Sequence, residues 1–361
     1  MSKILKLVSR FVMNGAGSQT VEVELTTDGG VFRAALPHFR RFDQTQVINF
    51  MDVVKSQMAP CLVGASFSNF NQIDSQLQQF GFEISSCVYL VVYQALATYN
   101  RSSLVKFISR QFKTQIRCPR LVVPVIVGPR LSLVDYSLVS LTTENQIINI
   151  FKVLNVLKAN QTLNQNNQIQ CELFDSEEPL RMIENALVQT GMKSLVGVGL
   201  NFNSKQYEKN GKYDLHVKQE IKSREPLNSS QLKTLIISWL QNPQITLIQN
   251  LIQEPNEEID TAVAEVQKQR IADKKNQLYV VSNAMTCANT QHVSFGQIKS
   301  FNEFLNNNEK PHKMYEFAGE SEDSGMCHYL CGLGYEFVKV NMYGAENTSK
   351  INELMRISDW M

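Results

Sequence analysis

The chain has 361 residues, of which 43% are hydrophobic and 19% are charged, and its formal net charge is +1. This composition is typical of a soluble globular protein long enough for two domains, and it argues against a nucleic-acid-binding protein, which needs a strongly basic face. No apolar run has the length of a membrane span or signal-peptide core, and the seven cysteines follow no disulfide framework, so we expect a cytoplasmic protein with reduced thiols.

Residues 20–37 predict a β-hairpin. Val21, Val23 and Leu25 alternate with polar residues, as in a strand buried on one face. Asp28-Gly29-Gly30 suits a tight turn, and a second alternating run ends before Pro37. Apolar periodicity then predicts helices at residues 47–60, 73–80, 86–98 and 103–112. Residues 1–119 are therefore expected to form an α+β domain, a β-meander followed by helices.

The pattern changes at Leu121–Val127, an apolar run typical of a strand covered on both faces. Helices are then predicted at residues 143–157, 179–190, 231–240, 259–272 and 349–357, and strands at 195–200, 245–248, 278–282, 314–317 and 336–340. This alternation predicts parallel strand pairing and a closed or nearly closed α/β barrel over residues 120–361.

Three local features of this second half carry predictions of their own. Thr143 and Gln146 fit a capping box. The Asn- and Gln-rich residues 160–170 predict a solvated loop, with an interaction segment as the alternative. Residues 327–331, Cys-His-Tyr-Leu-Cys, have the residue types of a metal motif, but packing on a helix is favoured because no second Cys/His pair lies nearby in the sequence.

The hairpin and five later segments, taken in order, resemble those of the enolase family. The later segments are Gly199-Leu200-Asn201 with Gly211-Lys212-Tyr213-Asp214-Leu215, then residues 246–250, 280–286, 318–323 and 350–357. The resemblance implies an enolase-like N-terminal α+β domain at residues 1–119 and an enolase-type α/β barrel at 120–361. The stretch from Asn289 to Glu316 is shorter than in the family by about one strand–helix unit, so the barrel is expected to lack that unit.

Enolases dehydrate 2-phosphoglycerate with a lysine base and magnesium ions. The positions that match the family's metal-binding Asp, Glu and Asp are Asn201, Gln249 and Asn283. Three formal negative charges are thus replaced by amides, so strong magnesium binding should be lost. We expect these amides to keep a buried hydrogen-bond network that needs no metal or other cofactor.

The resemblance also implies that the base and the substrate contacts are lost. Ser294 matches the base position, unless the segment is missing altogether, and serine does not abstract an α-proton unaided. Glu316, Phe317 and Ala318 replace substrate-binding residues of the family, the phosphate-binding arginine among them. Candidate residual groups are Lys339 as an anion contact and Asp135 and Glu172 as carboxylates.

These losses favour a non-catalytic enolase-like protein that acts as a scaffold or interaction component of a larger assembly. Its expected partners are other proteins, including a second copy or an enolase-like chain, rather than nucleic acid or membrane. A cytoskeletal or ciliary assembly is one expected location. Two alternatives stay open, an enzyme of altered chemistry that uses Lys339, Asp135 or Glu172, and a sensor that binds phosphoglycerate without turnover.

Overall fold

The computed structural model describes residues 3–36, 44–80, 82–128, 135–159, 161–171, 177–202, 208–214, 225–251, 257–281, 312–317 and 321–361. The chain forms two compact units. Unit 1 comprises Met1–Pro119 with Met285–Met361, and unit 2 comprises Arg120–Ala284. Within unit 1, the last part of the chain therefore packs with the first.

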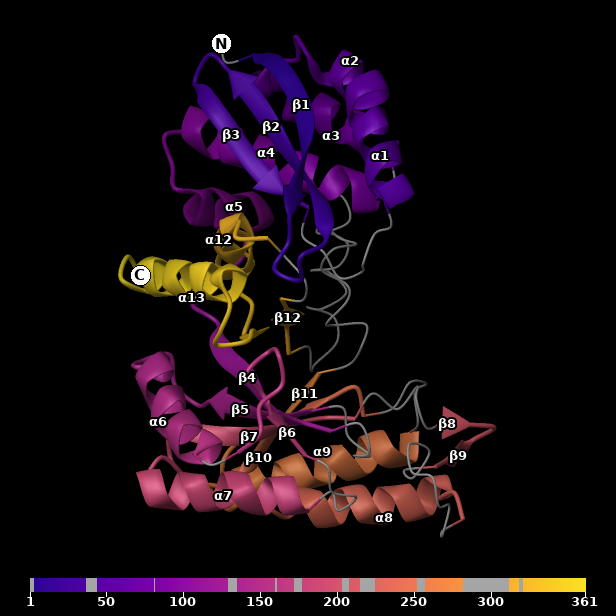
Figure 1. The fold of residues 1–361 in the computed structure, drawn as a ribbon, viewed down its shortest axis with the longest axis vertical. Helices are drawn as coiled ribbons and strands as arrows, with labels where there is room; N and C mark the ends of the chain where they lie inside the picture. The colour runs from indigo at the N-terminus through magenta and orange to yellow at the C-terminus, as the bar shows by residue number, and fades with distance from the viewer. Residues whose placement is uncertain are drawn as a thin grey trace. The chain divides into compact units, whose positions relative to one another are not determined.

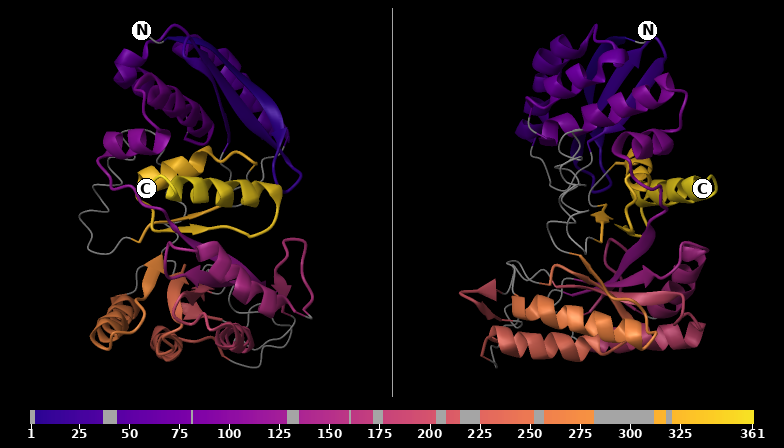
Figure 2. Two further views of the ribbon diagram at one scale, coloured as in Figure 1. Left: turned by 90° about the vertical axis from the view of Figure 1, so that its left-hand side faces the viewer. Right: turned by 180° about the vertical axis from the view of Figure 1, so that it is seen from behind.

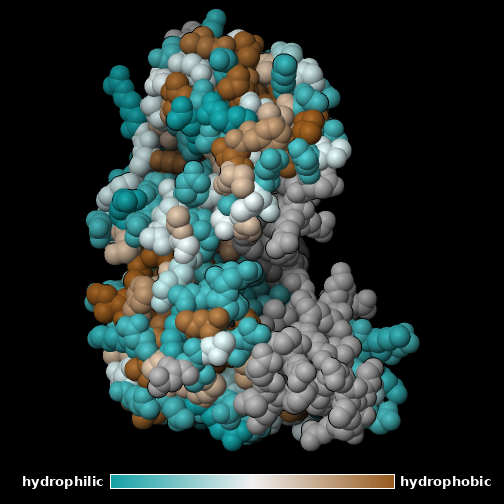
Figure 3. All heavy atoms as spheres, viewed as in Figure 1, coloured by the Kyte–Doolittle hydropathy of each residue, from teal (hydrophilic) through white to brown (hydrophobic). Residues whose placement is uncertain are grey.

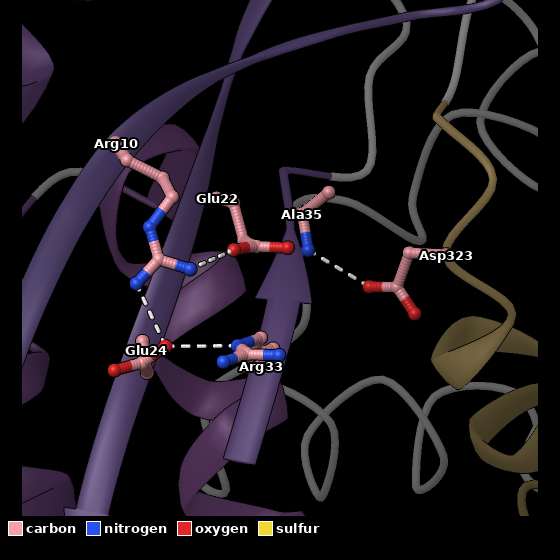
Figure 4. A network of polar contacts seen from close by, with 6 residues as sticks. All are labelled: Arg10, Glu22, Glu24, Arg33, Ala35 and Asp323. Carbon is pink, nitrogen blue, oxygen red and sulfur yellow. Dashed lines mark hydrogen bonds and ion pairs between the residues drawn. The ribbon is translucent and has the colours of Figure 1, made fainter. Parts of the chain in front are cut away.

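Unit 1 begins with an antiparallel meander of β1 (Ile4–Met13), β2 (Gln19–Thr27) and β3 (Gly30–Ala35), in that order (Figure 1). The predicted hairpin is confirmed, with Thr27 paired to Gly30 across the turn. Val23 and Leu25 are fully buried on one face of the sheet. On the other face, the Arg10 guanidinium lies 2.6 Å from a Glu22 carboxylate oxygen (Figure 4).

Helices cover the buried face of the meander. They are α1 (Gln44–Val53), a π-helical turn at Val54–Met58, α2 (Ala59–Leu62), a 3-10 turn at Phe67–Asn69, α3 (Phe70–Leu77), α4 (Phe82–Tyr99) and α5 (Leu104–Phe112). Among these, α4 packs against β2 and β3. Its apolar run is buried on every side over Cys87–Tyr93, since α5 covers it too. The predicted helices of this region are confirmed.

The rest of unit 1 consists of β12 (Met314–Glu316), α12 (Gly325–Gly332), β13 (Phe337–Lys339) and α13 (Ala345–Ser358). β12 and β13 pair in parallel, and α12 packs between α5 and α13. Gly332 allows the close approach to α5, because a Cβ there would lie 2.7 Å from Ile108. The last helix starts at Ala345 rather than at Ser349, since the Thr348 N–H and hydroxyl both donate to the Gly344 carbonyl.

Unit 2 is an α/β layer structure. Its strands are β4 (Arg120–Val127), β5 (Asp135–Ser140), β6 (Ile169–Gln170), β7 (Val196–Asn201), β10 (Ile245–Gln249) and β11 (Tyr279–Val281), with a small hairpin of β8 (Glu208–Lys209) and β9 (Lys212–Tyr213). Its helices are α6 (Gln146–Lys158), α7 (Glu178–Thr190), α8 (Ser229–Leu240) and α9 (Glu257–Ala272). Helices α7, α8 and α9 lie side by side against the sheet (Figures 1 and 2).

The strand order in unit 2 is β11-β10-β7-β5-β4, with β6 beside β4. The neighbours β7, β10 and β11 are parallel, as predicted. The expectation of parallel pairing throughout is wrong for β5, which is antiparallel to both β4 and β7. The sequence patterns did not predict this strand, and the short connection from β4 leaves no room for a crossover helix, so the chain turns back on itself.

The sheet of unit 2 is curved like part of a barrel. Arg120 at the start of β4 and Tyr279 at the start of β11 belong to opposite ends of the strand order. Nevertheless, the Arg120 guanidinium lies 4.4 Å from the centre of the Tyr279 ring and donates to its hydroxyl over 3.0 Å. The predicted fold class is thus confirmed, an N-terminal meander with helices and an enolase-type α/β barrel architecture. The shortened strand–helix unit falls mostly on residues 282–311, outside the described residues.

Two local predictions in unit 2 are wrong. Gln146 forms no capping box with Thr143. The helix starts at Gln146, whose side-chain oxygen instead accepts the Leu121 N–H over 2.8 Å, so a contact with β4 replaces the local cap. The stretch from residue 161 to 170 is not simply a solvated loop, because Ile169 is buried and pairs with Ile126 to form β6.

Candidate functional site

The predicted site residues of unit 2 meet at one edge of its sheet. Asn201 is the last residue of β7 and Gln249 the last of β10, and the parallel register places them side by side. Asp135 is the first residue of the antiparallel β5 and lies directly opposite Asn201. An antiparallel strand begins where its parallel neighbours end, so the reversal of β5 brings a carboxylate to this edge.

These side chains form a buried hydrogen-bond chain. The Asn201 amide nitrogen donates to Asp135 Oδ2 over 2.8 Å, and Ser137 Oγ donates to Asp135 Oδ1 over 2.8 Å. The Asn201 amide oxygen in turn accepts from the Asn250 amide over 3.2 Å. Asn201, Asp135, Gln249 and Asn250 are all at most 7% exposed. We call Asp135, Ser137, Asn201 and Asn250 the strand-end network.

Sequence reasoning missed two members of the strand-end network. Ser137 lies two residues after Asp135, on the same face of β5, and a period-two pattern would have indicated it once the strand was known. Asn250 follows Gln249 with a φ of 57°, a left-handed conformation that asparagine tolerates better than most residues. Its backbone N–H donates to the Val281 carbonyl over 2.9 Å, which ties the turn to β11.

The donors that the structure describes at this edge do not fit a magnesium ion. Magnesium needs oxygen ligands in octahedral geometry, including carboxylates that offset its charge. Here the Asn201 amide points an N–H group at the carboxylate and its oxygen is already hydrogen-bonded. The Asn250 Oδ1 atom is buried and has no hydrogen-bond partner within the described part of the chain, but one neutral oxygen does not replace the charge of a carboxylate.

In unit 1, Lys339 and Glu316 lie opposite each other on the parallel strands β13 and β12. The Lys339 ammonium is 3% exposed and lies 3.5 Å from a Glu316 carboxylate oxygen. A glutamate that replaces a histidine of the family therefore partly neutralises the lysine predicted to contact an anion. That anion contact remains a prediction.

Phe317 follows β12, and the resemblance matches it to the family's phosphate-binding arginine. Its backbone N–H donates to the Lys339 carbonyl over 2.9 Å. The buried Phe317 ring packs edge-on against Tyr315, with 4.9 Å between the ring centres. The Lys350 ammonium lies 5.8 Å from the centre of the Phe317 ring. The position thus offers an apolar surface in place of a guanidinium. The remaining predicted site residues, Asn283, Ser294, Ala318 and Glu172, lie outside the described residues.

Asp323 ends the 318–323 segment that resembles the family, and its contacts lie within unit 1. Its carboxylate accepts the Ala35 N–H at the end of β3 over 2.8 Å (Figure 4). It also accepts the Gly325 N–H at the start of α12 over 2.8 Å. Burial raises the pKa of Asp323, although both N–H groups and the nearby Lys350 oppose the shift. The side chain therefore joins the meander to α12.

Cys327 and Cys331 are buried on α12, as the packing interpretation predicts. The Cys327 thiol contacts the Lys350 carbonyl over 3.5 Å, and His328 Nε2 lies 2.8 Å from a Glu353 carboxylate oxygen. Cys327 and His328 thus have separate protein partners on α13.

The fold and the polar strand ends define an α/β-barrel protein with a site at the carboxyl ends of its parallel strands. Residues 148–361, more than half of the chain, match the family described as Enolase, C-terminal TIM barrel domain. The chain belongs to the enolase family. No helix in its described ranges is long and apolar enough to cross a bilayer.

Proposed function

We propose that this enolase-family chain has no enolase activity and acts as a structural or interaction component of a protein assembly. The observation that carries the proposal is the 2.8 Å hydrogen bond from the Asn201 amide to Asp135. At a position that the resemblance matches to a metal ligand, the side chain is thus engaged in a hydrogen bond within the chain.

Enolase chemistry needs charge that this site lacks. The reaction builds an ene-diolate whose negative charge is stabilised by magnesium, while a base removes the α-proton. Asn201 and Gln249 are neutral amides, and Asp135 is already bonded to Asn201 and Ser137. None of these side chains offers an ammonium base.

The contacts in unit 1 argue against the alternative of a phosphoglycerate sensor. A phosphate group that approached Lys339 would compete with the Glu316 carboxylate for the same ammonium. Phe317 presents a ring where the family presents a guanidinium, so a bidentate phosphate contact is missing there.

An interaction role is supported by exposed apolar side chains on the meander. Leu5, Phe11 and Met13 on β1 and Val31 on β3 are all exposed. On the face seen in Figure 3, hydrophobic and hydrophilic residues are interspersed over this part of the chain. Residues such as Phe11 and Met13 are of the types enriched at protein interfaces.

A turnover assay tests the proposal. The purified chain is incubated with 2-phosphoglycerate and Mg²⁺, and formation of phosphoenolpyruvate is followed alongside a catalytically active enolase. The proposal predicts no turnover and no binding of 2-phosphoglycerate by calorimetry. Saturable binding without turnover would instead favour a phosphoglycerate sensor, and turnover would show that the chain is an active enzyme. Native mass spectrometry of wild type and of a Phe11→Ser/Met13→Ser variant then tests whether the meander forms an interface.

A further inference from the structure

Unit 1 contains a cavity that no residue of the strand-end network lines. It lies between β3, α4 and the start of α12 and has a volume of about 390 Å³. This is within the range of small-ligand sites, roughly 300–1,000 Å³. Its wall combines one aromatic ring, that of Phe32, with the polar side chains of Gln94, Thr98, Ser102, Asp323 and His328.

Asp323 only accepts hydrogen bonds, whereas Gln94, Thr98, Ser102 and Ser324 in the same wall each carry donors as well as acceptors. Asp323 accepts one backbone N–H at each carboxylate oxygen, which leaves lone pairs on both. His328 Nε2 faces the Glu353 carboxylate, which also accepts from Arg356 over 2.6 Å. A carboxylate only accepts, so Nε2 carries the proton and Nδ1 keeps its lone pair.

The surroundings of His328 also determine the protonation state of its imidazole. Burial lowers the pKa of its imidazole, although Glu353 and Asp323 act in the opposite direction, so the neutral form persists at neutral pH. Nδ1 is buried and has no hydrogen-bond partner among the residues that the structure describes. Because Nδ1 has almost no accessible surface, a donor in the cavity reaches it only when the imidazole ring turns.

No lysine or arginine is among the described residues that line the cavity, where Asp323 supplies a carboxylate whose charge the nearby Lys350 offsets in part. An aromatic ring beside a carboxylate is a typical recognition element for an organic cation. We propose that this cavity binds a primary ammonium group on a short stem, with the Asp323 carboxylate as the acceptor and the Phe32 ring beside the stem.

The test uses n-butylamine as the probe and 1-butanol as its uncharged counterpart of similar shape. Both are titrated into the full chain while NMR follows the His328 ring and the Gly325 amide. The proposal predicts a saturable shift with butylammonium and binding of butanol that is at least about tenfold weaker, the ratio expected for loss of a charged hydrogen bond. Nα-acetyl-lysine amide is titrated in parallel, and tighter binding of this probe would identify a lysine side chain rather than a free amine as the source of the ammonium.

Thr98→Met fills the cavity from an exposed position of α4 without removing Asp323 or His328. Its matched control is Thr234→Met on α8, because both threonine hydroxyls donate to the carbonyl four residues earlier. Thr98→Met should abolish the saturable shift, and Thr234→Met should retain it. The proposal is overturned if butylamine gives no saturable shift, if butanol binds equally well, or if Thr98→Met binds as the wild type does.

Discussion

Asn201 and Asp135 lie directly opposite each other on the antiparallel strands β7 and β5, and the Asn201 amide donates to the Asp135 carboxylate over 2.8 Å. Both side chains are buried. An amide in this position satisfies a buried carboxylate, whereas a second carboxylate would repel it unless a proton or a cation lay between them. The strand-end network is therefore stable with an amide at residue 201.

Asn201→Asp should destabilise the chain at neutral pH. The two buried carboxylates would interact, and the pKa of the pair would rise above the ordinary range of aspartate. The loss in the free energy of unfolding should be about 3 kcal/mol at pH 7, as for other uncompensated buried charges. A carboxyl pKa that is raised in the folded state makes the loss grow as pH increases through that pKa and shrink as pH falls below it.

The control is the exchange Asn201→Asp with Asp135→Asn, which keeps one amide and one carboxylate in contact. Urea unfolding at pH 7 and pH 5 measures all variants. The exchanged pair should regain most of the stability lost by the single variant. A single variant as stable as wild type at pH 7 would show that the hydrogen bond does not hold this edge together.

Tyr93→Phe should not lower the free energy of unfolding. The Tyr93 hydroxyl is buried and has no hydrogen-bond partner in the described part of the chain, so its removal relieves an unsatisfied group. Tyr89→Phe is the matched comparison, because the Tyr89 hydroxyl donates to Asp74 Oδ1 over 2.8 Å. Tyr89→Phe should cost about 1–3 kcal/mol in urea unfolding, since it removes a buried hydrogen bond to a carboxylate. If both variants lost the same free energy of unfolding, the two hydroxyls would not differ in their contribution to stability, and the prediction would be wrong.

The contact between Arg120 and Tyr279 should contribute to closure of the curved sheet. A double-mutant cycle with Arg120→Met and Tyr279→Leu separates this contact from the loss of each side chain. The coupling free energy from urea unfolding should be about 1 kcal/mol, combining a cation–π contact with a hydrogen bond. Strictly additive losses would mean that the two strand ends do not stabilise each other.

Lys313→Met should increase stability at pH 7 but not at pH 11. Burial lowers the pKa of the Lys313 ammonium to about 8, with Glu336 opposing the shift and Arg117 adding to it. Because the folded-state pKa is below that of the unfolded chain, the unfolded chain binds the additional proton and the lysine destabilises the fold below about pH 8. The penalty fades as pH rises toward the unfolded pKa.

Guanidinium unfolding across this pH range gives the result, with Lys275→Met as the control for loss of an exposed lysine. If Lys313→Met gained the same stability at pH 7 and pH 11, removal of the lysine charge would not be the cause of the gain.

The sequence predicted the meander, most helices and the parallel strands, because their apolar periodicity matches their burial. It did not predict β5, whose six residues are all buried and therefore do not alternate. Gln146 shows the same limit, since its contact with Leu121 on β4 replaces the local cap. Family resemblance identified Asn201 and Gln249. The roles of Asn250 and Ser137 follow only from the hydrogen bonds that the structure shows at the strand ends.

Titration calorimetry of Mg²⁺ into the full chain at pH 7 tests the central claim most directly, with Gln249→Met as the comparison. The account predicts no saturable heat, or a heat that is unchanged in Gln249→Met and therefore arises elsewhere on the chain. Saturable Mg²⁺ binding that is lost in Gln249→Met would place the ion at the strand ends and contradict the account.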